Sequence, residues 1–179
     1  MKKLLLSAIL FLAALATYAQ DRPKLIVGIM VDQMRCDYLH RYYNLYGDGG
    51  FKRMMNEGFD CENTMINYIP AITAVGHTSV YTGTVPSIHG IQGNNFLLDG
   101  KKTYCTADNS VQGVGTKSKS GQMSPHNLLT TTIGDELKVA TDFKSRVIGI
   151  SIKDRAAILP AGHAADAAYW IDSDQSRFV

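Results

Sequence analysis

Two residues whose side chains could act together in phosphate chemistry are Asp32 and Thr73. Asp32 follows an apolar run, and Thr73 stands where a helix can begin. A helix N-terminus offers unpaired N–H groups and the positive end of a dipole to an anion. A divalent metal held by Asp32 could deprotonate the Thr73 hydroxyl, which is otherwise a poor nucleophile at neutral pH. The alternative is that Thr73 is only an N-cap and Asp32 only a turn residue.

A second candidate group is the pair of cations in Lys153-Asp154-Arg155. In an extended segment, side chains two residues apart leave from the same face, so Lys153 and Arg155 would converge while Asp154 points away. Two converging cations fit a dianionic phosphoryl group, with Arg supplying paired donors and Lys a point charge. The alternative is a solvated charged turn.

The segment between these groups holds further polar candidates. Asn94 and Asn95 follow Gly93 and could donate amide hydrogens to a transferring phosphoryl group, or could be turn residues. His77 and His89 could bind a metal or support its ligands. We interpret both histidines as structural.

The elements that would position these residues indicate an α/β fold. Residues 25–31 and 146–152 are continuous apolar, β-branched runs, which are typical of strands covered on both faces of a parallel sheet. Helical patterns over 34–46, 51–56 and 126–139 follow or separate them, so the chain reads as a doubly wound, mostly parallel sheet with flanking helices. Ligands of such sheets bind outside the carboxyl ends of the strands, where Asp32 and Lys153-Asp154-Arg155 would share one rim.

The helix that carries the candidate nucleophile is predicted over residues 74–82. Thr73 would be its N-cap, and Gly83 would take the left-handed position that ends it. Pro86 would prevent the helix from continuing.

The N-terminus has the pattern of a secretory signal peptide over residues 1–19. Lys2 and Lys3 precede an apolar run that ends in the small-x-small site Thr17-Tyr18-Ala19. The alternative, a membrane anchor, is disfavoured because the run is shorter than the roughly 20 residues of a spanning helix. We expect a periplasmic or secreted protein with no stable membrane insertion after cleavage.

Residues 20–179 would then form one domain without a nucleic-acid partner. Removing the leader takes Lys2 and Lys3 from the eighteen Lys and Arg, which leaves sixteen against sixteen Asp and Glu. A chain with no net charge has no electrostatic footprint for nucleic acid. The Gly/Ser/Lys-rich stretch 113–121 is predicted to be a surface loop.

Three cysteines could be oxidised in such a compartment. Cys61 and Cys105 lie in short segments with strand character, and we predict that they pair while Cys36 stays free. The alternative is that all three are reduced and buried.

The run from Thr73 to Asn95 resembles the nucleophile segment of the type I phosphodiesterase and nucleotide pyrophosphatase branch of the alkaline phosphatase superfamily. Within that branch it is most similar to the phosphate-irrepressible periplasmic alkaline phosphatases. The likeness extends from Val31-Asp32-Gln33-Met34-Arg35 to residues 153–163.

The resemblance implies a phosphate monoester hydrolase that uses two zinc ions and a threonine nucleophile. Asp32 and Thr73 would be zinc ligands, and Thr73 would attack phosphorus to give a phosphothreonine intermediate. Asn94, Lys153 and Arg155 would bind the phosphoryl oxygens of a small phosphate ester. The cation pair favours monoesters, because diesterases of this branch manage without it.

The chain departs from the family in its metal ligands. The family's Asp-x-x-x-His and Asp-His motifs are absent, whereas a zinc site needs at least three protein ligands. We therefore expect the N-terminal part of a longer, truncated catalytic domain, inactive by itself. Two alternatives stay open: a phosphodiesterase or nucleotide pyrophosphatase, and a non-catalytic exported binding domain. A sulfatase is disfavoured because its Cys-x-Pro-x-Arg pattern is missing.

Overall fold

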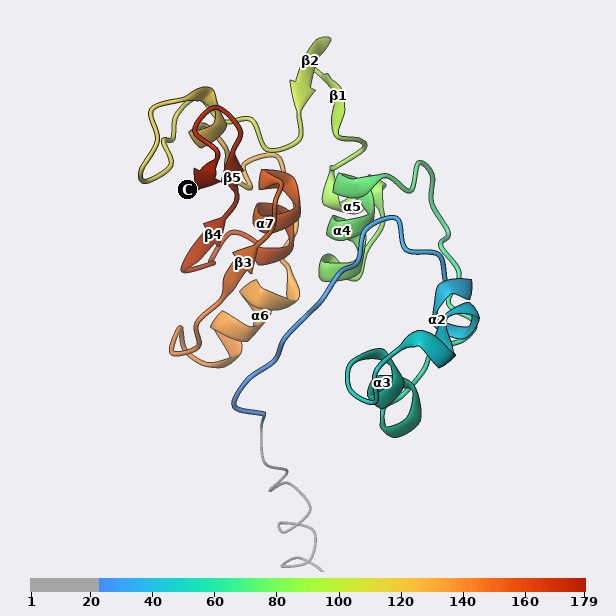
Figure 1. The fold of residues 1–179 in the computed structure, drawn as a ribbon. Helices are drawn as coiled ribbons and strands as arrows, with labels where there is room; N and C mark the ends of the chain where they lie inside the picture. The colour runs from blue at the N-terminus through green and yellow to red at the C-terminus, as the bar shows by residue number, and fades with distance from the viewer. Residues whose placement is uncertain (1–22) are drawn as a thin grey trace, which may run out of the picture. The chain divides into compact units, whose positions relative to one another are not determined.

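A computed structural model describes residues 23–179 of the chain (Figure 1). The predicted signal peptide, residues 1–19, lies outside the described residues. The chain divides into a segment that ends at Val31 and a larger unit, Asp32–Val179, which are described separately. Within residues 23–179, no helix combines the length and apolar character that a membrane crossing requires.

The first predicted strand, residues 25–31, is not formed. The segment has no strand assignment, and most of its apolar side chains are exposed, with Leu25 79% and Ile29 75% accessible. A strand needs a neighbouring strand for its backbone groups, and no ladder among residues 23–179 includes this segment. The apolar pattern was therefore insufficient evidence for a buried strand here.

The region after Asp32 is helical but interrupted. The single helix predicted over 34–46 is wrong, because the structure has α2 (Asp37–Arg41) and the short 3₁₀ helix η1 (Tyr43–Leu45), separated by Tyr42 at ψ 12°. The next predicted helix is confirmed as α3 (Phe51–Glu57), and it ends at Gly58.

Helix α4 (Thr73–Thr82) is present one residue earlier than predicted. Its N-cap is Ile72, so Thr73 is the first helical residue and its side chain is free of a capping role. The prediction for the C-terminus is confirmed, because Gly83 has φ 65° in the left-handed region. Pro86 then begins α5 (Pro86–His89), where its missing N–H costs nothing.

A β-hairpin follows, formed by β1 (Asn95–Leu98) and β2 (Lys101–Tyr104). Asp99 and Gly100 join the strands with φ of 50° and 75°, the signs that a two-residue type I′ turn requires. The register pairs Asn95 with Tyr104. The base of the hairpin therefore brings the end of the predicted nucleophile segment beside Tyr104.

The Gly/Ser/Lys-rich stretch 113–121 is a packed loop that contains the 3₁₀ helix η2 (Lys119–Gly121). Thr116 is buried, and its hydroxyl donates to Oδ2 of Asp172 at 2.5 Å. The indole of Trp170 donates to the carbonyl of Ser120 at 2.9 Å. These bonds tie the loop to the hairpin of β5 (Ile171–Asp172) and β6 (Arg177–Phe178).

Helix α6 (Ile133–Ala140) occupies only the second half of the helix predicted over 126–139. Thr132 ends the preceding irregular segment with a capping box, in which Thr132 and Asp135 bond to each other's backbone N–H. This local signal, rather than hydrophobic periodicity, sets the start of the helix.

The strand predicted over residues 146–152 is confirmed over a shorter range, and it begins a βαβ unit that was not predicted. Strand β3 (Ile148–Ile150) runs into α7 (Asp154–Ala161) and then into β4 (Ala167–Tyr169), which pairs with β3 in parallel. Gly149 allows the close approach, because a Cβ there would overlap the carbonyl oxygen of Ala157. The predicted burial of both faces is wrong here, since Ile148 and Ile150 are 54% and 69% exposed.

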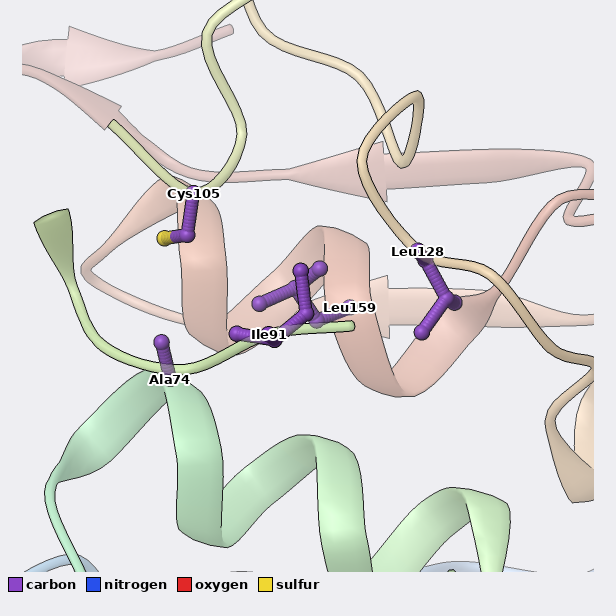
Figure 2. Packing of buried hydrophobic residues seen from close by; sticks show 5 residues of the cluster. All are labelled: Ala74, Ile91, Cys105, Leu128 and Leu159. Atoms are coloured by element: carbon purple, nitrogen blue, oxygen red, sulfur yellow. The ribbon is translucent and has the colours of Figure 1, made fainter. Parts of the chain in front are cut away.

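The core lies between helices α4 and α7, which pack against each other. Figure 2 shows Ala74 at the start of α4 facing a cluster that contains Leu159 from α7 and Ile91, Cys105 and Leu128 from the intervening chain. Burying these side chains stabilises the fold by roughly 25 cal/mol for each Å² of apolar surface removed from water. The core thus joins the start of α4 to the second half of α7.

The predicted disulfide between Cys61 and Cys105 is wrong. All three cysteines are free, with Cys36 and Cys61 exposed and Cys105 fully buried. Burial raises the pKa of the Cys105 thiol to about 12, with a further contribution from Asp154. Cys105 behaves as a small apolar core residue.

Candidate active site

The nucleophile candidate contacts the predicted metal ligand. The Thr73 hydroxyl donates to Oδ2 of Asp32 at 3.0 Å, across 41 positions of sequence. Asp32 is exposed and Thr73 is half-buried at the first turn of α4. Asp32 lies in a turn rather than after a strand, so its position follows from this hydrogen bond and not from the predicted rim of a sheet.

Asn94 lies beside the same helix start. Its Oδ1 accepts the backbone N–H of Ala74 at 3.0 Å. Since a backbone N–H can bond only to the amide oxygen, this contact assigns the orientation of the side chain and leaves the NH₂ group as a donor. The backbone carbonyl of Asn94 also accepts the N–H of Cys105 at 3.0 Å, which anchors Asn94 to the base of the hairpin.

The predicted cation pair has a different geometry from the one expected. Lys153 is the N-cap of α7 and Arg155 already lies in its first turn, so the argument from an extended segment does not apply. Lys153 is exposed, whereas Arg155 is half-buried. Within residues 23–179, neither cation forms a hydrogen bond with Thr73.

A polar network that the sequence did not predict surrounds Arg155. The Tyr104 hydroxyl accepts Nη1 of Arg155 at 2.9 Å and donates to Oδ1 of Asp154 at 3.0 Å. The hydroxyl of buried Thr106 donates to the other oxygen of Asp154. The Asp99-Gly100 dipeptide could have revealed the hairpin that carries Tyr104, because Asp-Gly between strand-forming residues is a strong hairpin signal.

The network also shifts the ionisation of its members. Burial, helped by the Asp154 charge, raises the pKa of Tyr104 to about 12, although Arg155 opposes the shift. Burial alone would lower the pKa of Arg155, but the Tyr104 hydrogen bond and the Asp154 charge outweigh it and raise that pKa. Tyr104 therefore stays a neutral hydroxyl and Arg155 a cation through the physiological range.

The structural interpretation fits the contacts of both histidines. His89 is fully buried, its Nδ1 accepts the N–H of Ile91 at 3.1 Å, and its Nε2 contacts the Ser79 hydroxyl at 3.0 Å. Burial lowers the pKa of His89. His77 uses Nδ1 to contact the carbonyl oxygen of Thr73 at 2.8 Å. Both nitrogens of His89 are occupied, so it has no free lone pair for a metal.

Asp32 and Thr73 fit a divalent metal as two oxygen ligands, but they do not complete a site. Zinc takes carboxylate, imidazole or thiolate ligands and needs three or more from the protein. No group of three His, Cys, Asp or Glu side chains with metal-binding geometry occurs in the described part of the chain.

Comparison with known proteins identifies the family. Residues 26–177 match the family described as type I phosphodiesterase / nucleotide pyrophosphatase. The chain belongs to this family. The predicted membership is confirmed.

The chain is similar to three curated relatives. It is 56% identical to alkaline phosphatase PafA of Elizabethkingia meningoseptica over 94% of its length, and 58% identical to alkaline phosphatase PhoV of Synechococcus elongatus over 88%. It is also 59% identical over 93% of its length to a Myroides odoratus protein named calcium-transporting ATPase. The chain spans 31%, 29% and 31% of these relatives, respectively, or about a third of their length.

Solved structures confirm the predicted fold class. The chain matches the crystal structure of wild-type PafA with a TM-score of 0.86 and 56% identity, over 89% of this chain and 31% of that one. A PafA variant with a threonine, an asparagine, a lysine and an arginine replaced matches equally well, with a TM-score of 0.86. The structure is therefore a partial, alkaline phosphatase-like α/β core of this family.

Proposed function

We propose that this chain carries the nucleophile-bearing part of a zinc-dependent phosphate monoester hydrolase. The observation that carries the proposal is the contact between the Thr73 hydroxyl and Asp32 at the first turn of α4, with the amide of Asn94 beside it. The names of PafA and PhoV support phosphatase activity. The parent would act on small phosphate esters in the periplasm or outside the cell.

The residues altered in the PafA variant support the site assignment. That protein has a threonine, an asparagine, a lysine and an arginine replaced, in the chain order of Thr73, Asn94, Lys153 and Arg155. The separation of the threonine from the asparagine is the same in both chains, as is that of the lysine from the arginine. Four matching residue types in the same order, with two of the three separations identical, favour these four residues as one functional group.

In the proposed reaction, the Thr73 oxygen attacks phosphorus in line with the leaving oxygen. A bond from Thr73 Oγ1 to phosphorus forms, the ester P–O bond breaks, and the leaving group takes a proton. Water then hydrolyses the phosphothreonine. Metal bound at Asp32 and Thr73 would lower the pKa of the Thr73 hydroxyl and offset the charge that develops on oxygen.

The other residues bind and orient the phosphoryl group. The NH₂ group of Asn94 is left to donate once its oxygen is held by Ala74 N–H. Lys153 and Arg155 supply positive charge at the start of α7, where the helix dipole also favours an anion. Donors fixed before the reaction lower the barrier because they need no reorganisation in the transition state.

The deciding assay compares substrates and metals in the protein expressed from its full reading frame. We expect zinc-dependent hydrolysis of an aryl phosphate monoester, loss of activity with a chelator, and recovery with zinc. Absence of monoester turnover in the zinc-loaded protein would contradict the proposal. Turnover by residues 1–179 alone would contradict the expectation that this chain lacks essential metal ligands.

A diesterase is the second candidate, because the matching family is defined by phosphodiesterases and nucleotide pyrophosphatases. A higher kcat/KM for an aryl diester than for the monoester would favour it. ATP belongs in the same assay because of the name of the Myroides relative. Its terminal phosphoryl group carries the charge of a monoester, so hydrolysis of ATP would use the same residues of this chain.

A further inference from the structure

Tyr104 connects the hairpin to the start of α7 through a single hydroxyl group. That hydroxyl donates to Oδ1 of Asp154 at 3.0 Å and accepts Nη1 of Arg155 at 2.9 Å. A tyrosine hydroxyl has one hydrogen to donate. Because Asp154 takes that hydrogen, the lone pairs of the oxygen are directed to Arg155.

The other end of this arrangement is fixed by buried groups. Thr106 is fully buried and its hydroxyl donates to Oδ2 of Asp154, so both carboxylate oxygens are occupied. The Tyr104 ring packs against the core cluster that includes Ala74 and Leu159. The position of the Tyr104 hydroxyl is therefore fixed by the packing of its ring and by its hydrogen bonds to Asp154 and Arg155.

Arg155 keeps donors to spare. Its bond to Tyr104 uses one hydrogen of Nη1, out of the five that a guanidinium carries. Its Nε is buried and has no acceptor among residues 23–179. The guanidinium is thus oriented by Tyr104 without being neutralised by a bidentate carboxylate, which leaves it able to bind an anion.

The same hairpin base holds the amide of the candidate site. Asn95 pairs with Tyr104 in the strand register, and the carbonyl of Asn94 accepts the N–H of Cys105. Asn94 in turn accepts the N–H of Ala74 at the start of α4. One short piece of hairpin therefore contacts the starts of both helices, α4 through Asn94 and α7 through Tyr104.

We propose that Tyr104 is a positioning residue, whose hydroxyl fixes the guanidinium of Arg155 for binding a phosphoryl dianion. This inference rests on the proposed function, since it assigns Tyr104 to the same phosphate site. Tyr104 acts through Arg155 and does not itself contact substrate. Its importance is therefore greatest for monoesters, whose extra negative charge Arg155 binds.

The test is a double-mutant cycle in the protein expressed from its full reading frame. Tyr104→Phe, Arg155→Ala and the double variant are compared for kcat/KM with an aryl phosphate monoester and an aryl diester, and for binding of inorganic phosphate by calorimetry. Tyr46→Phe is the matched control, because it removes a tyrosine hydroxyl that bonds to the carbonyl of Tyr38 at 2.8 Å in another region.

We expect Tyr104→Phe to lower monoester kcat/KM by about 10-fold to 100-fold, by analogy with the loss of a residue that orients a metal ligand. Diester turnover should fall less, phosphate binding should weaken, and Tyr46→Phe should change neither. In the Arg155→Ala background, Tyr104→Phe should have no further effect. If Tyr104 had a merely structural role, Tyr104→Phe would lower kcat/KM equally for both substrates. The same loss would then also be seen in the Arg155→Ala background.

The outcomes separate this inference from the proposed function. The positioning role is overturned if Tyr104→Phe changes neither monoester turnover nor phosphate binding. It is also overturned if Tyr104→Phe lowers monoester kcat/KM by the same factor in the wild-type and Arg155→Ala backgrounds. Either result leaves the proposed function intact. A second result is possible, in which the wild-type protein does not hydrolyse the monoester. If Tyr104→Phe then still weakens phosphate binding, but only when Arg155 is present, the proposed function is overturned and the positioning role is supported.

Discussion

The starts of α4 and α7 hold their functional groups in different ways. At α4, Thr73 and Asp32 share one hydrogen bond, and Asp32 is exposed. At α7, Arg155 belongs to a network with Tyr104 and Asp154 that is anchored in the core. The first arrangement leaves the Asp32 carboxylate accessible, as the proposed metal binding requires. The second needs no additional group to fix the orientation of the cation.

This difference suggests a division of tasks within the family fold. As the proposed nucleophile, Thr73 would have to change its bonds during the reaction, and its single hydrogen bond to Asp32 is compatible with that role. The proposed phosphate-binding group, Arg155, should keep its orientation, and its bond to half-buried Tyr104 fixes that orientation before substrate arrives. Substitutions in the two regions should therefore differ in size and in substrate dependence.

The largest effect is expected at the start of α4. Thr73→Ala removes the proposed nucleophile and should lower kcat for an aryl phosphate by about 10³-fold or more, as loss of a covalent nucleophile does elsewhere. Thr82→Ala is a matched control, because Thr82 lies at the other end of α4 and bonds only to Thr78 and Thr84. Equal activity of the two variants in a monoester assay would exclude Thr73 as nucleophile.

The next largest effect is expected at the start of α7. Arg155→Ala should reduce monoester kcat/KM by about 10²-fold, the usual order for one oriented donor of transition-state charge. Lys153→Ala should cost less, because Lys153 is exposed and its position is not fixed by a partner. Measuring kcat/KM of both variants with a matched monoester and diester tests this prediction. A larger loss of monoester kcat/KM for Lys153→Ala than for Arg155→Ala would contradict it.

A third substitution disturbs the packing of α7 against β3 and changes no candidate site residue. Gly149→Ala places a methyl group against the carbonyl oxygen of Ala157 and should destabilise the fold by about 1–3 kcal/mol. In Gly76→Ala the new methyl group meets open space within α4, and the better helix propensity of Ala should stabilise by up to about 1 kcal/mol. Urea unfolding of both variants gives the comparison, and similar values would contradict the packing argument.

The smallest effect is expected on the pH dependence of stability, through buried His89 of α5 and its contact with α4. Burial lowers the pKa of His89 in the folded protein, so the unfolded chain binds a proton more readily. Its contribution to stability is complete above the ordinary pKa of 6.5 and is lost as pH falls from there through the lowered folded pKa. Melting temperatures between pH 8 and 5 should fall less steeply for His89→Gln than for wild type. The exposed-site control His40→Gln should keep the wild-type slope.

Local signals predicted much of the α4 region. Gly83 and Pro86 determine where α4 ends and α5 begins, and both are legible in the sequence because their backbone restrictions are intrinsic. Strand β3 was also predicted, because its apolar, β-branched run is continuous in the sequence. Helix α7 and strand β4, which complete the βαβ unit, were not predicted. The motif that carries the family resemblance also indicated Asp32 and Thr73, which the structure brings within hydrogen-bond distance.

Long-range relations could not be predicted in the same way. The partners Tyr104 and Arg155 are 51 positions apart, and their contact depends on the register of one hairpin and the packing of α7. The strand expected over residues 25–31 fails because apolar character says nothing about whether a neighbouring strand is available. The disulfide prediction fails for a related reason, since strand character does not bring Cys61 near buried Cys105.

The measurement that tests the central claim most directly is detection of phosphate on Thr73. Zinc-loaded protein from the full reading frame is quenched in acid during turnover of an aryl phosphate, digested, and mapped by mass spectrometry. The account predicts phosphate on Thr73 in wild type and none in Thr73→Ala. Steady turnover without any phosphate on Thr73, or with phosphate on another residue, would contradict it.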